Sequence, residues 1–451
     1  MLKQLFFLQY GYGAQFELTQ SLREGKDVEK YREIAQKIDA IPMEEGMRNR
    51  LMYAFWDQMA CIPASSETEK AEPSDYERIL ALRKKGKKLS VEGLSEERLF
   101  DKVYGAWLGR VIGCMFGKPV EGLKRNRIED ILKKLNNYPM RDYIVTGKDR
   151  EFCKKEWINF DALVENYGYA PADDDTDYTV IGLTVLEKYG KNFTTEDIAE
   201  EWIKGLPAIS CCTAEFCAYR NILNKVFPPF SATYRNPFRE WIGAQIRGDI
   251  FGYVAPFDPE RAAKYAYTDA RLSHTKNGIY GEMFVAAMLA AAYGDLTVEE
   301  VIEAGLSQIP HTSRLYKKIE ELLCDYRRGM SFEEFKEKFY ETYNENDMSD
   351  SVHTIPNALI VVACLLYSRG DFAEAIGNAV TCGFDTDCNG ATVGSVMGLL
   401  YGAKSIPERL SEPLHDRLET DIKGNYSVSI RDLARRTIDV IKKKEGKNNE
   451  L

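Results

Sequence analysis

Apolar residues recur at helical spacing along most of the chain, and the alternation typical of strands is nearly absent. The spacing is clear in "VEKYREIAQKIDAI" near the N-terminus, and it resumes from "LSEERLFDKVYGAWLG" to about residue 440. Ser95 is predicted to cap the helix that begins there, because a serine hydroxyl accepts a hydrogen bond from the free N–H groups at a helix start. Thr297 and Ser331 each begin a capping-box pattern. The pattern predicts an all-α fold.

A polar stretch, "PASSETEKAEPSD" from Pro63, separates the two helical regions and is typical of a linker. We predict an N-terminal helical accessory segment, a linker, a main domain and a charged tail, at residues 1–64, 65–92, 93–440 and 441–451. The accessory segment is rich in aromatic residues, and its role stays open between covering a site, oligomerisation and binding a partner.

Two runs of glycine at intervals of four are the clearest architectural signal, at Gly105, Gly109, Gly113 and Gly117 and at Gly390, Gly394, Gly398 and Gly402. Glycine inside a helix costs about 1 kcal/mol relative to alanine, so the runs need a compensating contact. Spacing of four places them on one helix face, where two backbones can approach closely. We predict two buried helices in tight contact with neighbours, and contact with each other would join the two ends of the domain. The alternative, a pair of glycine-rich loops, is disfavoured by the apolar residues between the glycines.

Composition describes an ordinary globular protein with a net charge of −10. That charge argues against nucleic-acid binding through a broadly basic face. The longest apolar run has about ten residues, too few to span a membrane, and no signal peptide is evident. Ten cysteines follow no disulfide framework, so we expect reduced thiols in a cytoplasmic protein.

Two acidic clusters carry the candidate chemistry, "DDDTD" from Asp173 and "DTD" from Asp385, each directly before an apolar run. One aspartate caps a helix, but three in succession exceed that need. Converged carboxylates repel and have to take up protons or bind a cation. Oxygen ligands suit Mg²⁺, Mn²⁺ or Ca²⁺. Spacing alone leaves a metal site and two independently capped helices as equal alternatives.

Three motifs in order, "GCMFGKPVE", "DDDTD" and "GFDTDCNGATVG", resemble those of the ADP-ribosylglycohydrolase family over about residues 101–403. The resemblance implies an orthogonal multi-helix bundle with a binuclear metal site at helix N-termini. It also implies two Mg²⁺ ions, with Mn²⁺ as an alternative, and cleavage of an N- or O-glycosidic bond at C1 of a protein-linked or small-molecule ADP-ribosyl or related ribosyl substrate.

Matched position by position, the resemblance implies the metal ligands Asp173, Asp174, Asp175, Asp385, Asp387 and Cys388. Cys388 stands where the family has a hydroxyl residue, and either Asn389 or the charge of Asp173 is available to compensate. Catalytic roles fall on Glu121, Asp174 and Asp387. Substrate contacts fall on His274 and on Gly243 and Arg247, because "GAQIRGD" from Gly243 resembles the family's glycine-rich phosphate-contacting loop.

Plainer interpretations stay open. Glu121 also fits a surface glutamate, His274 a helix-capping histidine and Arg247 an ordinary ion-pair partner. Two further functions compete with the leading one: hydrolysis of a nucleoside or other furanoside on the same fold, and a non-catalytic, ligand-binding member of the family.

Overall fold

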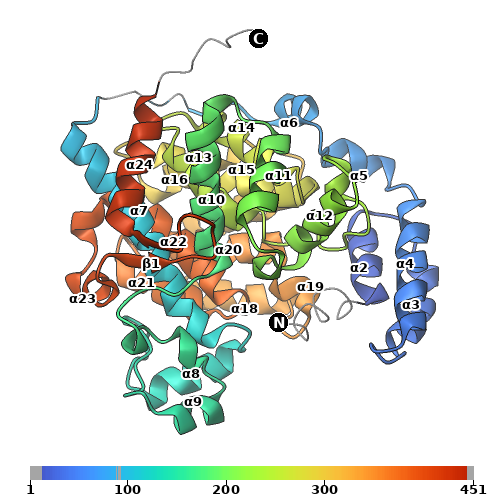
Figure 1. The fold of residues 1–451 in the computed structure, drawn as a ribbon, viewed down its shortest axis with the longest axis horizontal. Helices are drawn as coiled ribbons and strands as arrows, with labels where there is room; N and C mark the ends of the chain where they lie inside the picture. The colour runs from blue at the N-terminus through green and yellow to red at the C-terminus, as the bar shows by residue number, and fades with distance from the viewer. Residues whose placement is uncertain (1–12, 88, 90–92, 444–451) are drawn as a thin grey trace.

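The computed structural model describes residues 13–87, 89 and 93–443 (Figure 1). Parts of the predicted accessory segment, linker and tail lie outside these residues. The helices are α2 (Ala14–Arg23), α3 (Arg32–Asp39), α4 (Gly46–Ala60), α5 (Ser66–Ala71), α6 (Tyr76–Leu82), α7 (Glu96–Gly117), α8 (Arg125–Lys134), α9 (Arg150–Glu156), α10 (Asp174–Tyr189), α11 (Thr195–Gly205), α12 (Thr213–Leu223), α13 (Asp249–Tyr253), α14 (Pro259–Ala270), α15 (Lys276–Ala291), α16 (Val298–Leu306), α17 (Arg314–Arg327), α18 (Phe332–Thr342), α19 (Met348–Ser351), α20 (Thr354–Tyr367), α21 (Phe372–Thr381), α22 (Thr386–Tyr401), α23 (Glu408–Ser411) and α24 (Ile430–Lys442).

Two short strands accompany the helices, β1 (Arg417–Glu419) and β2 (Ser427–Ser429), paired antiparallel with Leu418 opposite Val428. The predicted all-α class is therefore confirmed. The predicted helix caps are confirmed as well: the Ser95 hydroxyl accepts from the Arg98 N–H, and both Thr297 and Ser331 form complete capping boxes. These elements form where the local sequence specifies them.

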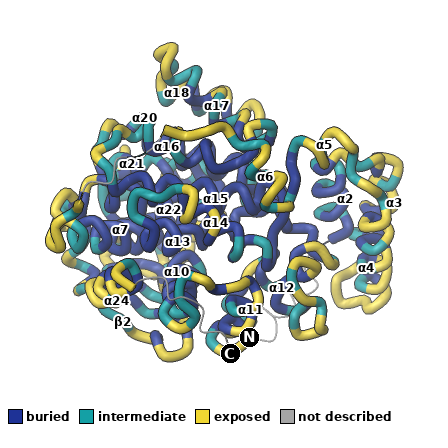
Figure 2. Tube along the Cα trace, turned by 90° about the horizontal axis from the view of Figure 1, so that it is seen from above, coloured by how far each residue is buried: buried dark blue, intermediate teal, exposed yellow. Residues whose placement is uncertain are grey.

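The core of the domain consists of helices that are buried on every side. All residues of α15 are buried, and α7, α20 and α22 are buried over most of their lengths (Figure 2). A helix buried all round needs no polar face, which is why "ALIVVACLLY" lies in α20 and forms part of the core. Within the described part of the chain, no helix is both long and apolar enough to cross a membrane.

The two glycine-rich helices, α7 and α22, pack directly against each other. A Cβ built on Gly113 would lie 1.9 Å from the Gly390 carbonyl oxygen, and one on Gly109 would lie 2.0 Å from that of Gly394. The contacts run in opposite directions along the two helices, so the end of α7 meets the start of α22. The sequence prediction of tight packing is confirmed, and it brings the first and last parts of the domain together.

The accessory segment forms a small core of its own and is joined to the domain by buried charges. Its helices α2 to α4 lie at one side of the molecule and enclose apolar side chains that include Leu18, Met52 and Trp56 (Figure 1). Arg239 of the domain forms ion pairs with Glu17 at 2.7 Å and Glu24 at 2.6 Å, all three being buried.

The predicted linker differs from the structure. Residues 65–82 form α5 and α6, capped by the side chains of Ser65 and Asp75. Glu72 between them is buried and forms an ion pair with Arg314 at 2.7 Å. A polar stretch therefore does not act as a free connector here, because its charged residues find partners on the domain that local sequence does not reveal.

Candidate metal centre

The two acidic clusters meet at one point, at the N-termini of α10 and α22. Asp173 is the N-cap of α10 and accepts a hydrogen bond from the Asp175 N–H at 2.9 Å. Asp385 is the N-cap of α22, and Asp387 lies in its first turn. The antiparallel contact between α7 and α22 holds the start of α22 beside the end of α7, where Thr386 donates to the Gly117 carbonyl at 2.9 Å.

Two groups of side chains in this cluster have metal-ligand spacing. In one, Asp175, Asp387 and Cys388 each offer an atom, and these atoms lie within 4.8 Å of one another. In the other, Asp175 is joined in the same way by Cys114 and Asp173. All five residues are buried. The structure thus brings together the predicted ligands Asp173, Asp175, Asp387 and Cys388, and adds Cys114.

Partnerless buried oxygens provide a test of whether a cation fits. Asp175 Oδ2 is buried and has no hydrogen-bond partner among the described residues, and the same holds for Asn389 Oδ1. An unpaired buried carboxylate oxygen is costly unless a cation or proton joins it. The donor set therefore fits a divalent ion held by Asp175, Asp387 and Cys388.

The neighbouring Asp174 and Asp385 extend the cluster. Burial, followed by the charges of Asp173 and Asp387, raises the pKa of Asp174 to about 8. Burial and the Asp387 charge also raise the pKa of Asp385 well above its ordinary value, and the two carboxyl groups share a hydrogen bond. Binding of a cation would displace the protons that such crowded carboxyl groups hold, and the resulting carboxylates could then act as its ligands.

Two cations of the protein already contact the cluster. Lys118, at the end of α7, contacts the Asp173 carboxylate and donates to the Ala172 carbonyl at 2.8 Å. Burial raises the pKa of Asp173, but the Lys118 ammonium outweighs it and holds that pKa below its ordinary value. Arg110, fully buried, donates to the Asp175 carbonyl at 2.7 Å and forms an ion pair with Asp249 at 2.9 Å.

Glu121 and Cys212 lie at the exposed rim of the cluster. The Asp387 charge raises the pKa of the exposed Glu121 carboxyl well above its ordinary value. Cys212, directly before α12, is exposed, and the charge of Asp174 is the largest cause of a raised pKa of its thiol. Glu121 is thus placed to meet a ligand that enters from solvent.

The predicted substrate-contacting residues lie deeper than their sequence match implies. Arg247 is buried and bonded to Glu215 at 2.5 Å, to Ser273 at 3.1 Å and to Asp269. A Cβ on Gly243 would lie 2.2 Å from the Glu215 carboxylate, so this glycine makes room for Glu215. Neither Gly243 nor Arg247 forms a phosphate loop open to solvent. The ion-pair interpretation of Arg247 is correct.

His274 belongs to the same buried network. Its Nδ1 lies 2.8 Å from the Ser273 hydroxyl, and its Nε2 has no partner among the described residues. Burial, with a further contribution from the Arg247 charge, lowers its pKa well below the ordinary value, so the ring is neutral. His274 is not a helix cap, since it lies before α15, whose N-cap is Thr275.

The sequence does not indicate the contacts that several residues make in the site. Lys118 and Arg110 are separated from the aspartates they contact by more than 50 residues. Glu215, whose pKa burial raises to about 7 against the opposing charge of Arg247, carries no motif. Cys114 and Lys118 do lie within the quoted motif "GCMFGKPVE", but the motif does not show which aspartates they meet.

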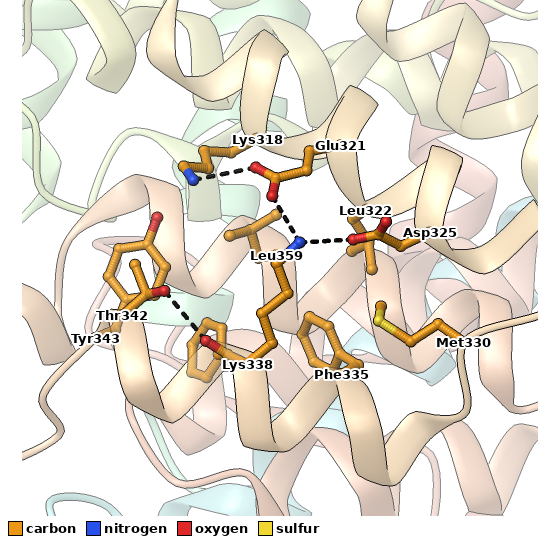
Figure 3. A pocket seen from close by; sticks show the side chains of 11 residues that line it. Lys318, Glu321, Leu322, Asp325, Met330, Phe335, Lys338, Thr342, Tyr343 and Leu359 are labelled. Carbon is orange, nitrogen blue, oxygen red and sulfur yellow. Dashed lines mark hydrogen bonds and ion pairs between the residues drawn. The ribbon is translucent and has the colours of Figure 1, made fainter. Parts of the chain in front are cut away.

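A separate pocket of about 40 Å³ lies between α17 and α18 and is drawn in Figure 3. Its interior is apolar, from Leu322, Phe335 and Leu359, and Lys338 spans its edge by ion pairs of 2.6 Å to both Glu321 and Asp325. No residue of the acidic cluster lines it. A pocket closed by such ion pairs lacks the converging polar groups of a catalytic site.

Fold and site together define an all-α protein with a carboxylate-rich centre at two helix N-termini. A model of the ADP-ribosylglycohydrolase family matches residues 95–447, most of the 451-residue chain. The chain belongs to this family.

Two comparisons accompany the match. A relative from Archaeoglobus fulgidus, an uncharacterized protein, is 24% identical over 329 residues, which span 70% of this chain and 92% of the relative. A solved structure titled "ADP-ribosylglycohydrolase-related protein complex" is 18% identical, with a TM-score of 0.48, and the match covers 76% of this chain and 98% of that one.

Proposed function

We propose that the protein is a divalent-metal-dependent glycohydrolase that cleaves an N- or O-glycosidic bond at C1 of an ADP-ribosyl or related ribosyl substrate. The observation that carries the proposal is the meeting of Asp173 and Asp387 at Asp175, which belongs to both ligand groups and has a buried Oδ2 without a partner among the described residues. Membership of the family supports the reaction class. The family resemblance implies two Mg²⁺ ions, with Mn²⁺ as an alternative.

The ion would be held by Asp175, Asp387 and Cys388, with Asp174 and Asp385 at its side. When bound, a divalent ion supplies Lewis-acid polarisation of oxygen atoms near it. The carboxylates of the cluster stabilise the positive charge that develops at C1 as the bond breaks. Their rigid placement on two helix starts keeps that arrangement fixed before substrate arrives.

Glu121 carries the proton transfer in this proposal. It is exposed at the rim, so it reaches both solvent and a bound substrate. When protonated, this carboxyl group can donate its proton to the leaving group. The same group, once ionised, can accept a proton from the attacking water.

The test measures metal binding and hydrolysis together. Asp174→Asn and Asp387→Asn are expected to weaken the binding of the divalent ion and to abolish hydrolysis of ADP-ribosyl-arginine. Glu121→Gln is expected to keep the ion and to lose roughly 10²- to 10⁴-fold in kcat. An Asp174→Asn protein with full metal occupancy and full activity would contradict the proposal.

Asp177→Asn is the matched control. Asp177 belongs to the same acidic run, but its carboxylate accepts from the Asp421 N–H at 3.1 Å. The asparagine keeps an acceptor for that bond, so both metal binding and activity are expected to persist.

A second candidate, hydrolysis of a ribosyl substrate without a diphosphate, is favoured by one observation. Arg247, the predicted phosphate contact, is enclosed by Glu215, Asp269 and Ser273 and is not free for a phosphate. Comparing the kcat/KM for ADP-ribosyl-arginine with that for simple nucleosides separates the two candidates.

A further inference from the structure

We propose that the ion at the start of α22 is bound through the sulfur of Cys388, and that this centre therefore selects a thiophilic divalent ion, such as Fe²⁺, Co²⁺ or Zn²⁺, over Mg²⁺. The inference rests on the proposed function in one respect, since both require an ion at the carboxylate cluster. It goes further by assigning the class of metal and a sulfur ligand.

Geometry is the first support. The ligand atoms of Asp175, Asp387 and Cys388 lie within 4.8 Å of one another. Three tetrahedral ligands of one ion, each about 2.0–2.3 Å from it, lie about 3.3–3.8 Å from one another. Side-chain adjustments of about 1 Å therefore suffice for one ion to contact all three residues.

The unpartnered oxygen is the second, independent support. Arg110 contacts Oδ1 of Asp175 at 3.3 Å and leaves Oδ2 buried without a partner. Asp175 is wholly inaccessible to solvent. Nothing else in the described chain satisfies this oxygen, and Cys388 lies in the same ligand group.

The chemistry of the donor set determines which ions suit it. Mg²⁺ takes oxygen ligands in a strict octahedron and dehydrates reluctantly. Sulfur is a soft ligand that favours later transition metals, and mixed sulfur and carboxylate sets bind Zn²⁺ and its neighbours. Replacing an oxygen ligand by Cys388 therefore shifts the preference away from Mg²⁺.

Cys114 offers an internal contrast. It belongs to the second group, with Asp173 and Asp175, but the Lys118 ammonium already contacts Asp173. The Cys114 thiol donates a hydrogen bond to Asp173, as the Cys388 thiol does to Asp385. The two sulfurs therefore differ in the Lys118 ammonium on the side of Cys114. A positive charge of the protein thus occupies this side of the cluster, and the structure assigns the metal-bound sulfur to Cys388.

The experiment uses the full-length protein after removal of metal by a chelator. Co²⁺ is titrated while absorption is recorded in the near ultraviolet, where a sulfur-to-cobalt charge-transfer band reports a Co–S bond directly. Thermal stabilisation by Mg²⁺, Mn²⁺, Co²⁺ and Zn²⁺ is measured at one concentration of each ion.

We expect the wild-type protein to show the band and to be stabilised more by Co²⁺ and Zn²⁺ than by Mg²⁺. Cys388→Ser is expected to lose the band and to bind Co²⁺ at least about tenfold more weakly, a loss comparable to removal of a supporting group at other metal sites. Its Mg²⁺ affinity is expected to be retained or raised. Cys114→Ser, in the same cluster, and Cys382→Ser, buried elsewhere, are expected to keep the band.

The wild-type measurements alone decide the matter if a variant fails to fold. Co²⁺ binding without a sulfur band, or Mg²⁺ stabilisation equal to that of Zn²⁺, would overturn the inference and leave the proposed hydrolase with an oxygen-only centre. A band that persists in Cys388→Ser would also overturn it. Failure of every divalent ion to bind would overturn both this inference and the proposed function.

Discussion

Two contacts between distant parts of the chain differ in what holds them. The α7–α22 contact joins two backbones through glycines that recur every four residues. The contact between the accessory segment and the domain depends on buried ion pairs, with Arg239 between Glu17 and Glu24. An atom added at the first contact would force the two helices apart, whereas removal of a charge from the second would leave its partner buried without that charge. Close packing leaves a periodic trace in the sequence, and buried ion pairs leave none.

The largest expected effect breaks the backbone contact. In Gly113→Ala the added methyl carbon would lie 1.9 Å from the Gly390 carbonyl oxygen, so the two helices have to separate. We expect a loss of about 5 kcal/mol or more in the free energy of unfolding, which is a large part of the stability of an ordinary domain. Urea denaturation measures it.

Gly46→Ala is the matched control for that prediction. Gly46 begins α4, and nothing lies within 4 Å of a Cβ built on it. The variant is expected to be as stable as the wild type or slightly more so. Equal losses in both variants would mean that the close approach of α7 and α22 does not carry the stability.

The next effect breaks the charged contact. Arg239→Met removes the cation that pairs with buried Glu17 and leaves Glu24 with only the Lys26 ammonium at 3.4 Å, which costs about 3–5 kcal/mol. We expect α2 to α4 to become susceptible to limited proteolysis while the domain stays folded. Glu200→Gln, which breaks only an exposed pair with Lys204, is expected to leave the stability unchanged.

The same pair gives a smaller effect that depends on pH. Burial raises the pKa of Glu24, but the charge and hydrogen bond of Arg239, together with the Lys26 charge and a hydrogen bond from Gln20, outweigh it and lower that pKa from 4.5 to about 2. A lowered pKa in the folded state means that the contribution is complete above pH 4.5 and is lost as the pH falls toward 2. Arg239→Met should remove this part of the acid dependence, measured as the midpoint of urea unfolding between these pH values.

The smallest effect concerns a purely local signal. Ser95→Ala removes the hydroxyl that accepts from the Arg98 N–H at the start of α7, and we expect a loss of about 1 kcal/mol. Ser95→Asp restores an acceptor and should recover most of it. An unchanged midpoint in Ser95→Ala would mean that packing, and not the cap, determines where α7 begins.

Sequence reasoning succeeded where one residue type does one physical task. Ser95, Thr297 and Ser331 cap helices because their hydroxyl groups reach the next free N–H, and no distant contact is needed. It failed for the linker, whose Glu72 pairs with Arg314, and for Gly243 and Arg247, which matched a phosphate loop but lie around Glu215. Those outcomes depend on partners remote in the chain.

The sequence by itself determined the helical class, the helix starts, the close packing of α7 against a neighbour and the two acidic runs, because each rests on periodicity or on groups a few residues apart. Only the tertiary structure decided that α22 is the neighbour and that Asp175, Asp387 and Cys388 converge. It also decided that Lys118 contacts Asp173, on the side of the cluster where Cys114 lies. Charges interact through space over a few ångströms, and the fold alone sets which of them lie that close.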